Sequence, residues 1–283
     1  MKMNILELLL NLKKIIDFVE VIMKNKSPYE ELKEEAWLAN KEIPARGLAM
    51  YTWGNVSAFD AARGVFAIKP SGVEYDKLQI DDMVVLDLDG KCVEGTLRPS
   101  SDTPTHLVLY RSFALQGESA GKVGGITHTH STFATAWAQA QRSIPIFGTT
   151  HADHSPNGVV CASVLSAEAV AGDYEAETGK AIVETFKNPP KDFAKCCSLP
   201  LSKRGEWTLV PHENPFVLVA GHGPFAWGEN AHKSVYNAAV LEEVARMAFI
   251  TLSVNPLTQP LANYVVDKHY QRKHGKNAYY GQK

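Results

Sequence analysis

The sequence predicts an α/β fold, and three observations support this prediction. Short apolar runs with strand character alternate with longer stretches whose apolar residues recur at helical spacing. The dipeptide Asp89-Gly90 lies between two of the short runs and is a typical hairpin turn. The chain has 283 residues, of which 45% are hydrophobic and 21% charged. It can therefore bury a sizeable core, in one large domain or two smaller ones.

The first element is an amphipathic helix over residues 1–27, where Ile, Leu and Val recur at helical spacing. Glu7, Asp17 and Glu20 interrupt its apolar residues, and no small-residue cleavage site ends them. This pattern argues against a signal peptide, a transit peptide or a membrane span. Pro28 separates the stretch from a second helix, expected from Tyr29 to about Lys41 and ended by Pro44 and Gly47.

The later elements follow the same two periodicities. A helix is expected after Ser100-Ser101-Asp102, whose side chains are suited to capping a helix N-terminus. No G-x-G-x-x-G motif follows a strand, so a dinucleotide-binding fold has no support. Extended segments are expected at 50–57, 64–69, 82–88, 91–94, 123–130, 144–146 and 216–220, helices at 103–114, 131–141, within 167–186 and at 230–252, an irregular loop at 187–211, and a polar, basic tail at 267–283.

Net charge and cysteine spacing restrict the classes of ligand and the compartment that we expect for this chain. The net charge is −2, and no cluster of Lys and Arg is dense enough to indicate nucleic-acid binding, although local donors could still hold a small anionic substrate. None of the four cysteines lies in a C-x-x-C arrangement, which argues against a cysteine zinc site. The absence of a disulfide framework suits a reducing compartment, so we expect a cytoplasmic protein.

The most informative motif is Thr127-His128-Thr129-His130, which closes the apolar run 123–126. Side chains two apart on a strand point to the same face, so His128 and His130 can grip one metal ion. Asp102 and His222 could complete a zinc-type ligand set of three histidines and one carboxylate. The alternative is that the pair consists of two polar residues on a surface strand.

Three short segments combine polar donors with small residues that let backbone N–H groups approach an oxyanion. They are Gly54-Asn55, Ser71-Gly72 and Ser100-Ser101, and Lys69 adds a positive charge beside the second. Together they indicate a phosphate-binding region. The alternative for each dipeptide is an ordinary turn.

Several longer segments carry a resemblance to the class II aldolase/epimerase family, and more narrowly to its L-ribulose-5-phosphate 4-epimerases. The resemblance covers about residues 30–283 and leaves the first helix without a counterpart. It therefore implies a helical extension at 1–28 and one domain at 29–283, with a mainly antiparallel central sheet flanked by helices in the adducin-like fold. The segments are TWGNVSAFD (52–60), FAIKPSGVEYD (66–76), EGTLRPSSDTPTH (94–106), GGITHTH (124–130), IPIFGTTHAD (144–153), GHGPFAWG (221–228) and DKHYQRKHGKNAYYGQ (267–282).

The resemblance also implies a role for each matching residue. Asp153 and Tyr280 match an acid/base pair on opposite sides of the substrate, and His269 matches a further residue near the active site. The metal ligands, normally for Zn²⁺ with Mn²⁺ as an alternative, are Asp102, His128, His130 and His222, and the substrate phosphate contacts are Gly54, Asn55, Ser71, Gly72, Ser100 and Ser101, with Lys69 adjacent.

The implied activity interconverts L-ribulose 5-phosphate and D-xylulose 5-phosphate by breaking and remaking the C3–C4 bond, because the C4 hydrogen is not acidic. The upstream sugar could come from an arabinose or an ascorbate route. The family assembles as a C4 homotetramer in which the C-terminal tyrosine reaches a neighbouring subunit. If Asp153 and Tyr280 come from different chains, mixing Tyr280→Phe with Asp153→Asn subunits should restore some sites.

Two alternatives remain. A sugar-phosphate aldolase of the same family would use the same metal and release the fragments, but the aldolases place Glu, working as a base, where this chain has Asp102. A catalytically inactive adducin-like module is expected to lose metal ligands, and here all four candidates are present.

Overall fold

The computed structural model describes residue 13 and residues 27–197 and 200–280 of the chain. The chain divides into two compact units, Met1–Glu31 and Leu32–Lys283, and the sheet and the site lie in the second unit. The amphipathic helix expected before Pro28 falls outside the described residues, apart from Lys13. A domain boundary after residue 28 therefore stays a prediction.

One eight-stranded sheet organises the second unit, and its strand order is β4-β3-β2-β1-β5-β8-β7-β6. Every neighbouring pair is antiparallel except β6 and β7, which confirms the expected mainly antiparallel sheet. The strands are β1 (Asn55–Asp60), β2 (Val65–Ile68), β3 (Val84–Asp87), β4 (Cys92–Glu94), β5 (Gly125–His128), β6 (Cys161–Ala162), β7 (Phe216–Val219) and β8 (Pro224–Gly228).

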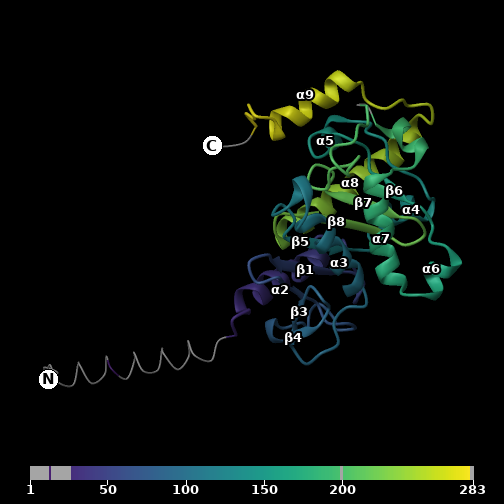
Figure 1. The fold of residues 1–283 in the computed structure, drawn as a ribbon. Coiled ribbons are helices and arrows are strands. Elements are labelled where there is room, and N and C mark those ends of the chain that lie inside the picture. The colour runs from purple at the N-terminus through teal and green to yellow at the C-terminus, as the bar shows by residue number, and fades with distance from the viewer. Residues whose placement is uncertain (1–12, 14–26, 198–199, 281–283) are drawn as a thin grey trace, which may run out of the picture. The chain divides into compact units, whose positions relative to one another are not determined.

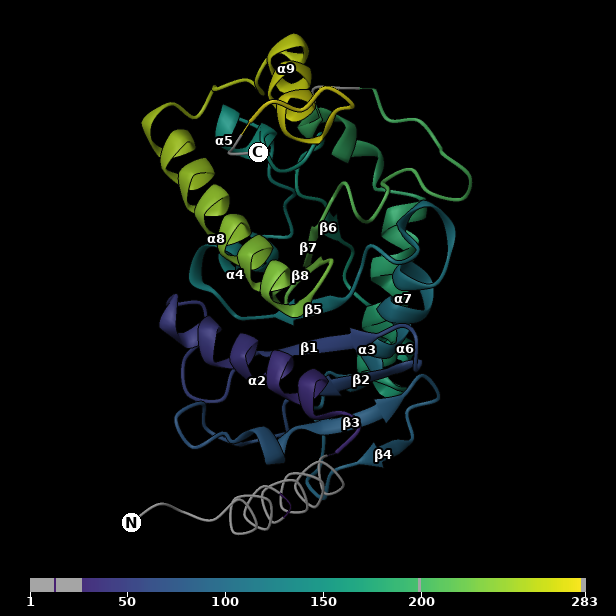
Figure 2. The same ribbon diagram turned by 90° about the vertical axis from the view of Figure 1, so that its left-hand side faces the viewer.

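Helices cover both faces of this sheet. In Figure 2, α2 and α8 lie in front of the sheet and α3 and α7 lie behind it, whereas α5 and α9 lie together at the top of both views (Figures 1 and 2). The α-helices are α2 (Glu30–Ala45), α3 (Thr103–Leu109), α4 (Thr132–Gln139), α5 (Thr149–Ala152), α6 (Ala167–Ala171), α7 (Tyr174–Lys187), α8 (Ala231–Val254) and α9 (Asn263–His274). The other helical segments are the 3₁₀ helices η1 (Ile80–Asp82), η3 (Gly117–Ser119) and η4 (Lys191–Cys196) and the π-helical segment η2 (Tyr110–Ala114), which follows α3 directly.

The side-chain alternation of β1 explains how the two faces differ. Phe59 stacks on Tyr110 of η2, with ring centroids 4.7 Å apart, and Ser57 lies 2.6 Å from the Tyr110 hydroxyl. Since side chains two apart share a face, Asn55 points to this same side, toward α3. On the other face, the carbonyl of Val56 accepts a 2.8 Å hydrogen bond from Asn40 of α2. The polar start of β1 is thus directed at the N-terminus of α3.

Two glycines allow close backbone packing at the strands that bear the site. A Cβ on Gly54, whose φ is +83°, would lie 2.5 Å from the carbonyl oxygen of His128. A Cβ on Gly125 would lie 2.4 Å from Cα of Ala231, at the start of α8. Since real Cβ atoms do not approach so closely, glycine at both positions lets β1 and α8 pack tightly against β5.

Glu242 of α8 determines where α4 begins. Its carboxylate accepts hydrogen bonds from the backbone N–H groups of Phe133 at 2.8 Å and Ala134 at 2.9 Å. Negative charge at a helix N-terminus is stabilising, because it pairs with N–H groups that have no partner within the helix. This contact lies immediately after His130 and therefore holds the backbone of the H-x-H motif.

Most expected elements are found, with five differences. Met50–Trp53 is a turn and not a strand, because Tyr51 has a φ of +54° and Met50 and Tyr51 are exposed. The strands β6 and β8 and the helices α5 and α9 were not expected from the sequence. No helix among the residues that the structure describes is long and apolar enough to cross a membrane.

Candidate active site

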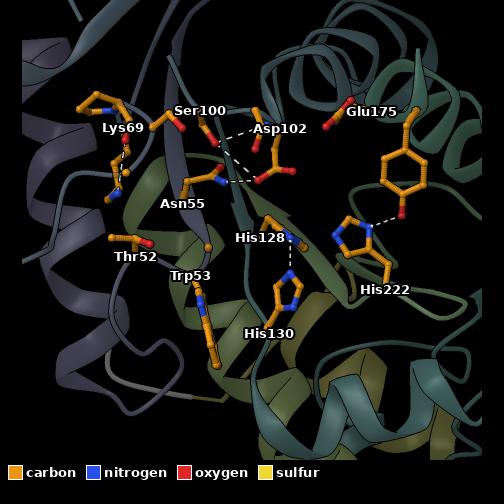
Figure 3. Close-up of a pocket in the computed structure, with 16 residues that line it drawn as sticks. Thr52, Trp53, Asn55, Lys69, Ser100, Asp102, His128, His130, Glu175 and His222 are labelled. Carbon is orange, nitrogen blue, oxygen red and sulfur yellow. Dashed lines mark hydrogen bonds between the residues drawn. The ribbon is translucent and has the colours of Figure 1, made fainter. Parts of the chain in front are cut away.

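The candidate site lies where β1, β5 and β8 pair side by side. Asn55, at the start of β1, is opposite His128, at the end of β5, and His128 is opposite Phe225 of β8. A cavity of about 660 Å³ opens beside these strand ends (Figure 3). Its lining residues are Thr52, Trp53, Gly54, Asn55, Lys69, Pro70, Ser71, Gly72, Ser100, Ser101, Asp102, His128, His130, Tyr174, Glu175 and His222.

Three of the four predicted metal ligands form one cluster. A ligand atom from each of His128, His130 and His222 lies within 4.8 Å of the others. The Nε2 atoms of His128 and His130 are 3.2 Å apart, joined by a dashed line in Figure 3. Although β5 ends at His128, the chain beyond it still turns His130 to the same side, as the i, i+2 spacing predicts.

Local contacts fix the orientation of His128. Its Nδ1 donates a 3.0 Å hydrogen bond to the carbonyl of Pro224, and its ring stacks on Phe225 with centroids 4.2 Å apart. Donation from Nδ1 leaves the lone pair of Nε2 directed at the cluster. Metal-binding histidines are usually held in this way by a backbone carbonyl.

The protonation of the cluster suits a cation. Burial lowers the pKa of His128 to about 3, and burial also lowers the pKa values of His130 and His222. All three imidazoles are therefore neutral near pH 7, which is the form that binds a metal ion. Three neutral nitrogen ligands with a carboxylate nearby fit a zinc-type divalent cation.

Asp102, the fourth predicted ligand, lines the same cavity but does not belong to the three-histidine cluster. Its Oδ2 accepts a 2.6 Å hydrogen bond from Nδ2 of Asn55 and lies 3.5 Å from Oγ of Ser100. Burial raises the pKa of Asp102, but the nearby His128 and His106 and the Asn55 bond more than offset this and hold it below its usual value. Asp102 begins α3 without capping it through its side chain, so its carboxylate remains available to the cavity.

The opposite side of the cavity is suited to an anion. Lys69 is buried, and its Nζ lies 3.3 Å from the carbonyl of Pro70 and 5.0 Å from the centroid of the Tyr75 ring. Among the described residues no carboxylate pairs with it, and burial lowers its pKa to about 8. A buried lysine without an acidic partner favours an anionic ligand.

The predicted phosphate-binding segments lie next to Lys69. The backbone N–H of Ser100 donates to the carbonyl of Lys69 at 3.0 Å, and that of Ser71 donates to the carbonyl of Arg98 at 2.9 Å. These bonds hold the two serine-containing segments side by side. Gly72, with a φ of +71°, completes the turn after Ser71. All six predicted phosphate-contact residues line the cavity together with Lys69.

Tyr174 and Glu175, at the start of α7, also line the cavity and were not identified from the sequence. The Tyr174 hydroxyl lies 3.4 Å from Nδ1 of His222, and the backbone carbonyl of Glu175 accepts a 2.6 Å hydrogen bond from Thr105. The only signal in the sequence was Asp173, which caps α7 and marks these residues as a helix N-terminus. Nothing in that pattern places the helix beside His222.

Within one chain, the predicted acid/base residues lie outside this cavity. Asp153 ends α5, and its carboxylate is bound by Arg272 and His269 of α9, whereas Tyr280 packs its ring over Arg272. None of Asp153, His269 and Tyr280 lines the cavity. Burial raises the pKa of Asp153, but hydrogen bonds from Arg272 and His269 and the charge of Lys273 hold it below its usual value. Asp153 is therefore ionised near neutral pH.

Comparison with known proteins identifies the family. The family described as Class II Aldolase and Adducin N-terminal domain matches residues 34–249. The chain belongs to the class II aldolase and adducin family. A member of that family from Salmonella paratyphi B, the L-ribulose-5-phosphate 4-epimerase UlaF, is 50% identical over 254 residues, which cover 90% of this chain and 100% of the relative. The enzyme of the same name from Salmonella typhi is also 50% identical over the same coverage.

Solved structures of the class II aldolase and adducin family share the fold. An L-fuculose 1-phosphate aldolase superposes with a TM-score of 0.65 at 22% identity, over 87% of this chain and 97% of the aldolase. YgbL from Escherichia coli, described as a putative aldolase/epimerase/decarboxylase, has a TM-score of 0.62 at 22% identity, over 85% of this chain and 99% of YgbL. At these identities the likeness concerns the fold alone.

Acid stability provides a test of the buried histidines around the site. His106 and His151 are buried, and in the described part of the chain Nε2 of each has no hydrogen-bond partner. Burial lowers the pKa of each from 6.5 to about 4. Between these values only the unfolded chain binds the proton. The stability of the folded chain is therefore not reduced by these histidines above pH 6.5, and it falls as the pH falls toward 4. Each histidine should contribute a slope of about 1.4 kcal/mol per pH unit to the free energy of unfolding.

Chemical denaturation across this range, at fixed protein concentration, measures that slope. His151→Gln should flatten it by one histidine's share. An unchanged slope in His151→Gln would mean that His151 is already protonated in the folded protein.

Proposed function

We propose that this chain is a metal-dependent L-ribulose-5-phosphate 4-epimerase, which interconverts L-ribulose 5-phosphate and D-xylulose 5-phosphate. The observation that carries the proposal is a single cavity with a three-histidine cluster on one side and a buried lysine without an acidic partner on the other. Such a cavity suits a phosphorylated sugar whose oxygens face a cation. The relatives at 50% identity, matched over their full length, support this substrate.

In this proposal the two sides of the cavity have separate tasks. Lys69, Ser71 and Ser100, with backbone N–H groups at Gly72 and Ser101, hold the phosphate and keep the reacting fragments from leaving. His128, His130 and His222, joined by Asp102, would hold Zn²⁺ or another divalent cation. Such a cation supplies Lewis-acid stabilisation of negative charge on the substrate oxygens. Asn55 has a buried Oδ1 without a hydrogen-bond partner among the residues that the structure describes, and this atom is available to a substrate hydroxyl.

The chemistry requires proton transfer at the C4 oxygen. The carboxylate of Asp153 accepts the proton of the C4 hydroxyl, and the C3–C4 bond breaks. This leaves an aldehyde that carries the phosphate, and the electron pair of the broken bond passes to the other fragment, the enediolate of dihydroxyacetone. The held fragment turns, the bond reforms on the other face of the aldehyde, and Tyr280 returns a proton to the oxygen. Reversal of these roles serves the opposite epimer, and for this reason two groups are needed.

Because Asp153 and Tyr280 do not line the cavity of their own chain, we propose that a second copy supplies them. In a C4 homotetramer, each cavity can face the Asp153 and Tyr280 of one adjacent chain, and each chain can supply these groups to one adjacent cavity. His269 would accompany Asp153 into the neighbour's site. The contact between Asp153 and α9 is intact within one chain, so the tail can present these groups already ordered.

The direct test is incubation of the purified chain with L-ribulose 5-phosphate and Zn²⁺ or Mn²⁺, with products followed by ¹³C NMR. D-Xylulose 5-phosphate should form, and a chelator should stop its formation. Steady release of glycolaldehyde phosphate and dihydroxyacetone without D-xylulose 5-phosphate would contradict the proposal in favour of an aldolase. Absence of both turnover and metal binding would favour an inactive adducin-like module.

A further inference from the structure

Arg272, near the end of α9, forms a two-point contact with Asp153. Its Nε donates to Oδ1 at 3.0 Å and its Nη2 donates to Oδ2 at 2.7 Å. The paired geometry fixes the plane of the carboxylate as well as its position. The Asp153 side chain is 12% exposed and that of Arg272 is 25% exposed, so the contact is largely shielded from solvent.

The same arginine also holds the end of the chain. Its backbone carbonyl accepts hydrogen bonds from the N–H groups of Tyr279 at 3.0 Å and Tyr280 at 3.2 Å. The chain after α9 therefore folds back over the last turn of the helix. In addition, the Tyr280 ring centroid lies 5.0 Å from Cζ of Arg272, a cation–π distance. Arg272 thus contacts Asp153 with its guanidinium and Tyr280 with both its guanidinium and its backbone.

The other side chains near the Asp153 carboxylate do not make this connection. His269 lies 3.1 Å from Oδ1 and makes a single contact, and Lys273 lies 3.7 Å from Oδ2. Lys273 also lies 4.5 Å from the Tyr280 ring, but its point charge does not define the orientation of a carboxylate. Oδ1 already accepts from both Arg272 and His269. Oδ2 therefore keeps more capacity to accept a further proton.

We propose that Arg272 is a positioning residue that holds Asp153 and Tyr280 as one unit, so that the two proton-transfer groups of one chain enter one site together. This inference rests on the proposed epimerase function. Arg272 acts through Asp153 and Tyr280 and need not touch the substrate. Its planar, two-point contact fixes the orientation in which the Asp153 carboxylate meets the substrate.

The test is Arg272→Lys, which keeps the positive charge and removes the planar guanidinium group that donates to both oxygens of Asp153. The kcat for L-ribulose 5-phosphate should fall about 10- to 100-fold, as expected when reacting groups are displaced by about 1 Å. KM and metal content should stay within about twofold of wild type, because the cavity is formed by other residues. Lys276→Ala removes an exposed cation from the same tail and should retain wild-type kcat.

Two further measurements separate positioning from a general loss of structure. In Arg272→Ala, added guanidinium should restore part of kcat, whereas sodium chloride at equal ionic strength should not. The double variant Arg272→Lys/Asp153→Asn should be no slower than Asp153→Asn alone if Arg272 acts through Asp153. Fully additive losses, or wild-type kcat in Arg272→Lys, would overturn the inference while leaving the epimerase function intact. An inactive wild-type chain would instead overturn both.

Discussion

Replacing His130 with alanine is expected to abolish tight binding of one divalent cation per chain and to lower kcat/KM by at least about 10²-fold. His130 is exposed, so its truncation leaves no buried cavity and the fold should persist. His128 is less suitable because it is buried and stacks on Phe225, so its loss would also disturb the core. Metal content after dialysis and turnover of L-ribulose 5-phosphate measure the two effects.

His232→Ala is the matched control. It removes another exposed histidine, whose ring lies 2.7 Å from a carboxylate oxygen of Glu42 and away from the cavity lining. Metal content and turnover should both match wild type. If His130→Ala kept one tightly bound cation per chain, His130 would have to be removed from the ligand set.

The second large effect concerns Asp153, which sits with Tyr280 against the same arginine of one chain. Asp153→Asn should lose most epimerisation, by about 10²-fold or more, because asparagine cannot accept the proton. Its metal content should be unchanged, since Asp153 lies outside the cavity. Turnover equal to wild type with the metal retained would exclude Asp153 from proton transfer.

Mixed assemblies then test whether sites are shared. Asp153→Asn chains keep an intact cavity, and His130→Ala chains keep intact Asp153 and Tyr280. In equal, randomly assembled mixtures, half of the cavities are intact, and half of the neighbouring chains supply intact proton-transfer groups. About a quarter of the sites should therefore combine an intact cavity with intact proton-transfer groups. Recovery of about a quarter of wild-type activity would support sharing, and no recovery in confirmed hybrids would place cavity and tail of one site in the same chain.

The contact of Asp153 and Tyr280 with one Arg272 changes the result expected for the mixture of Tyr280→Phe and Asp153→Asn subunits. Mixing Tyr280→Phe with Asp153→Asn should give no recovery, because Arg272 holds the two groups of one chain together and every such pair in that mixture has one defective member. Activity in that mixture would instead mean that Asp153 and Tyr280 serve different sites.

The elements that could be predicted from sequence are those with a local cause. The Asp89-Gly90 turn and the short extended runs on either side of it lead directly to the β3–β4 hairpin, in which Gly90 has a φ of +82°. The H-x-H spacing brings the ring nitrogens of His128 and His130 within 3.2 Å, although the strand ends between them. Short-range geometry decides both outcomes.

The elements that were missed depend on tertiary packing. The strand β8 begins with Pro224 and ends with Gly228, two residues that usually argue against a strand, yet all five of its residues are buried. The helix α9 buries only Val266, so its sequence has no apolar stripe. The position of Tyr174 beside His222 follows from the placement of α7, which the pattern of its own residues does not reveal.

The order of strands in the sheet has a kinetic consequence. The strands β1 to β4 pair in sequence order through consecutive connections within residues 55–94, so their contacts are local. The histidine cluster instead needs β5 to pair with β8, about a hundred residues further along, and Asp102 joins it only across the β1–β5 seam. Long loop closures are slow steps in folding. A newly made chain should therefore complete its first meander well before it can retain a metal ion.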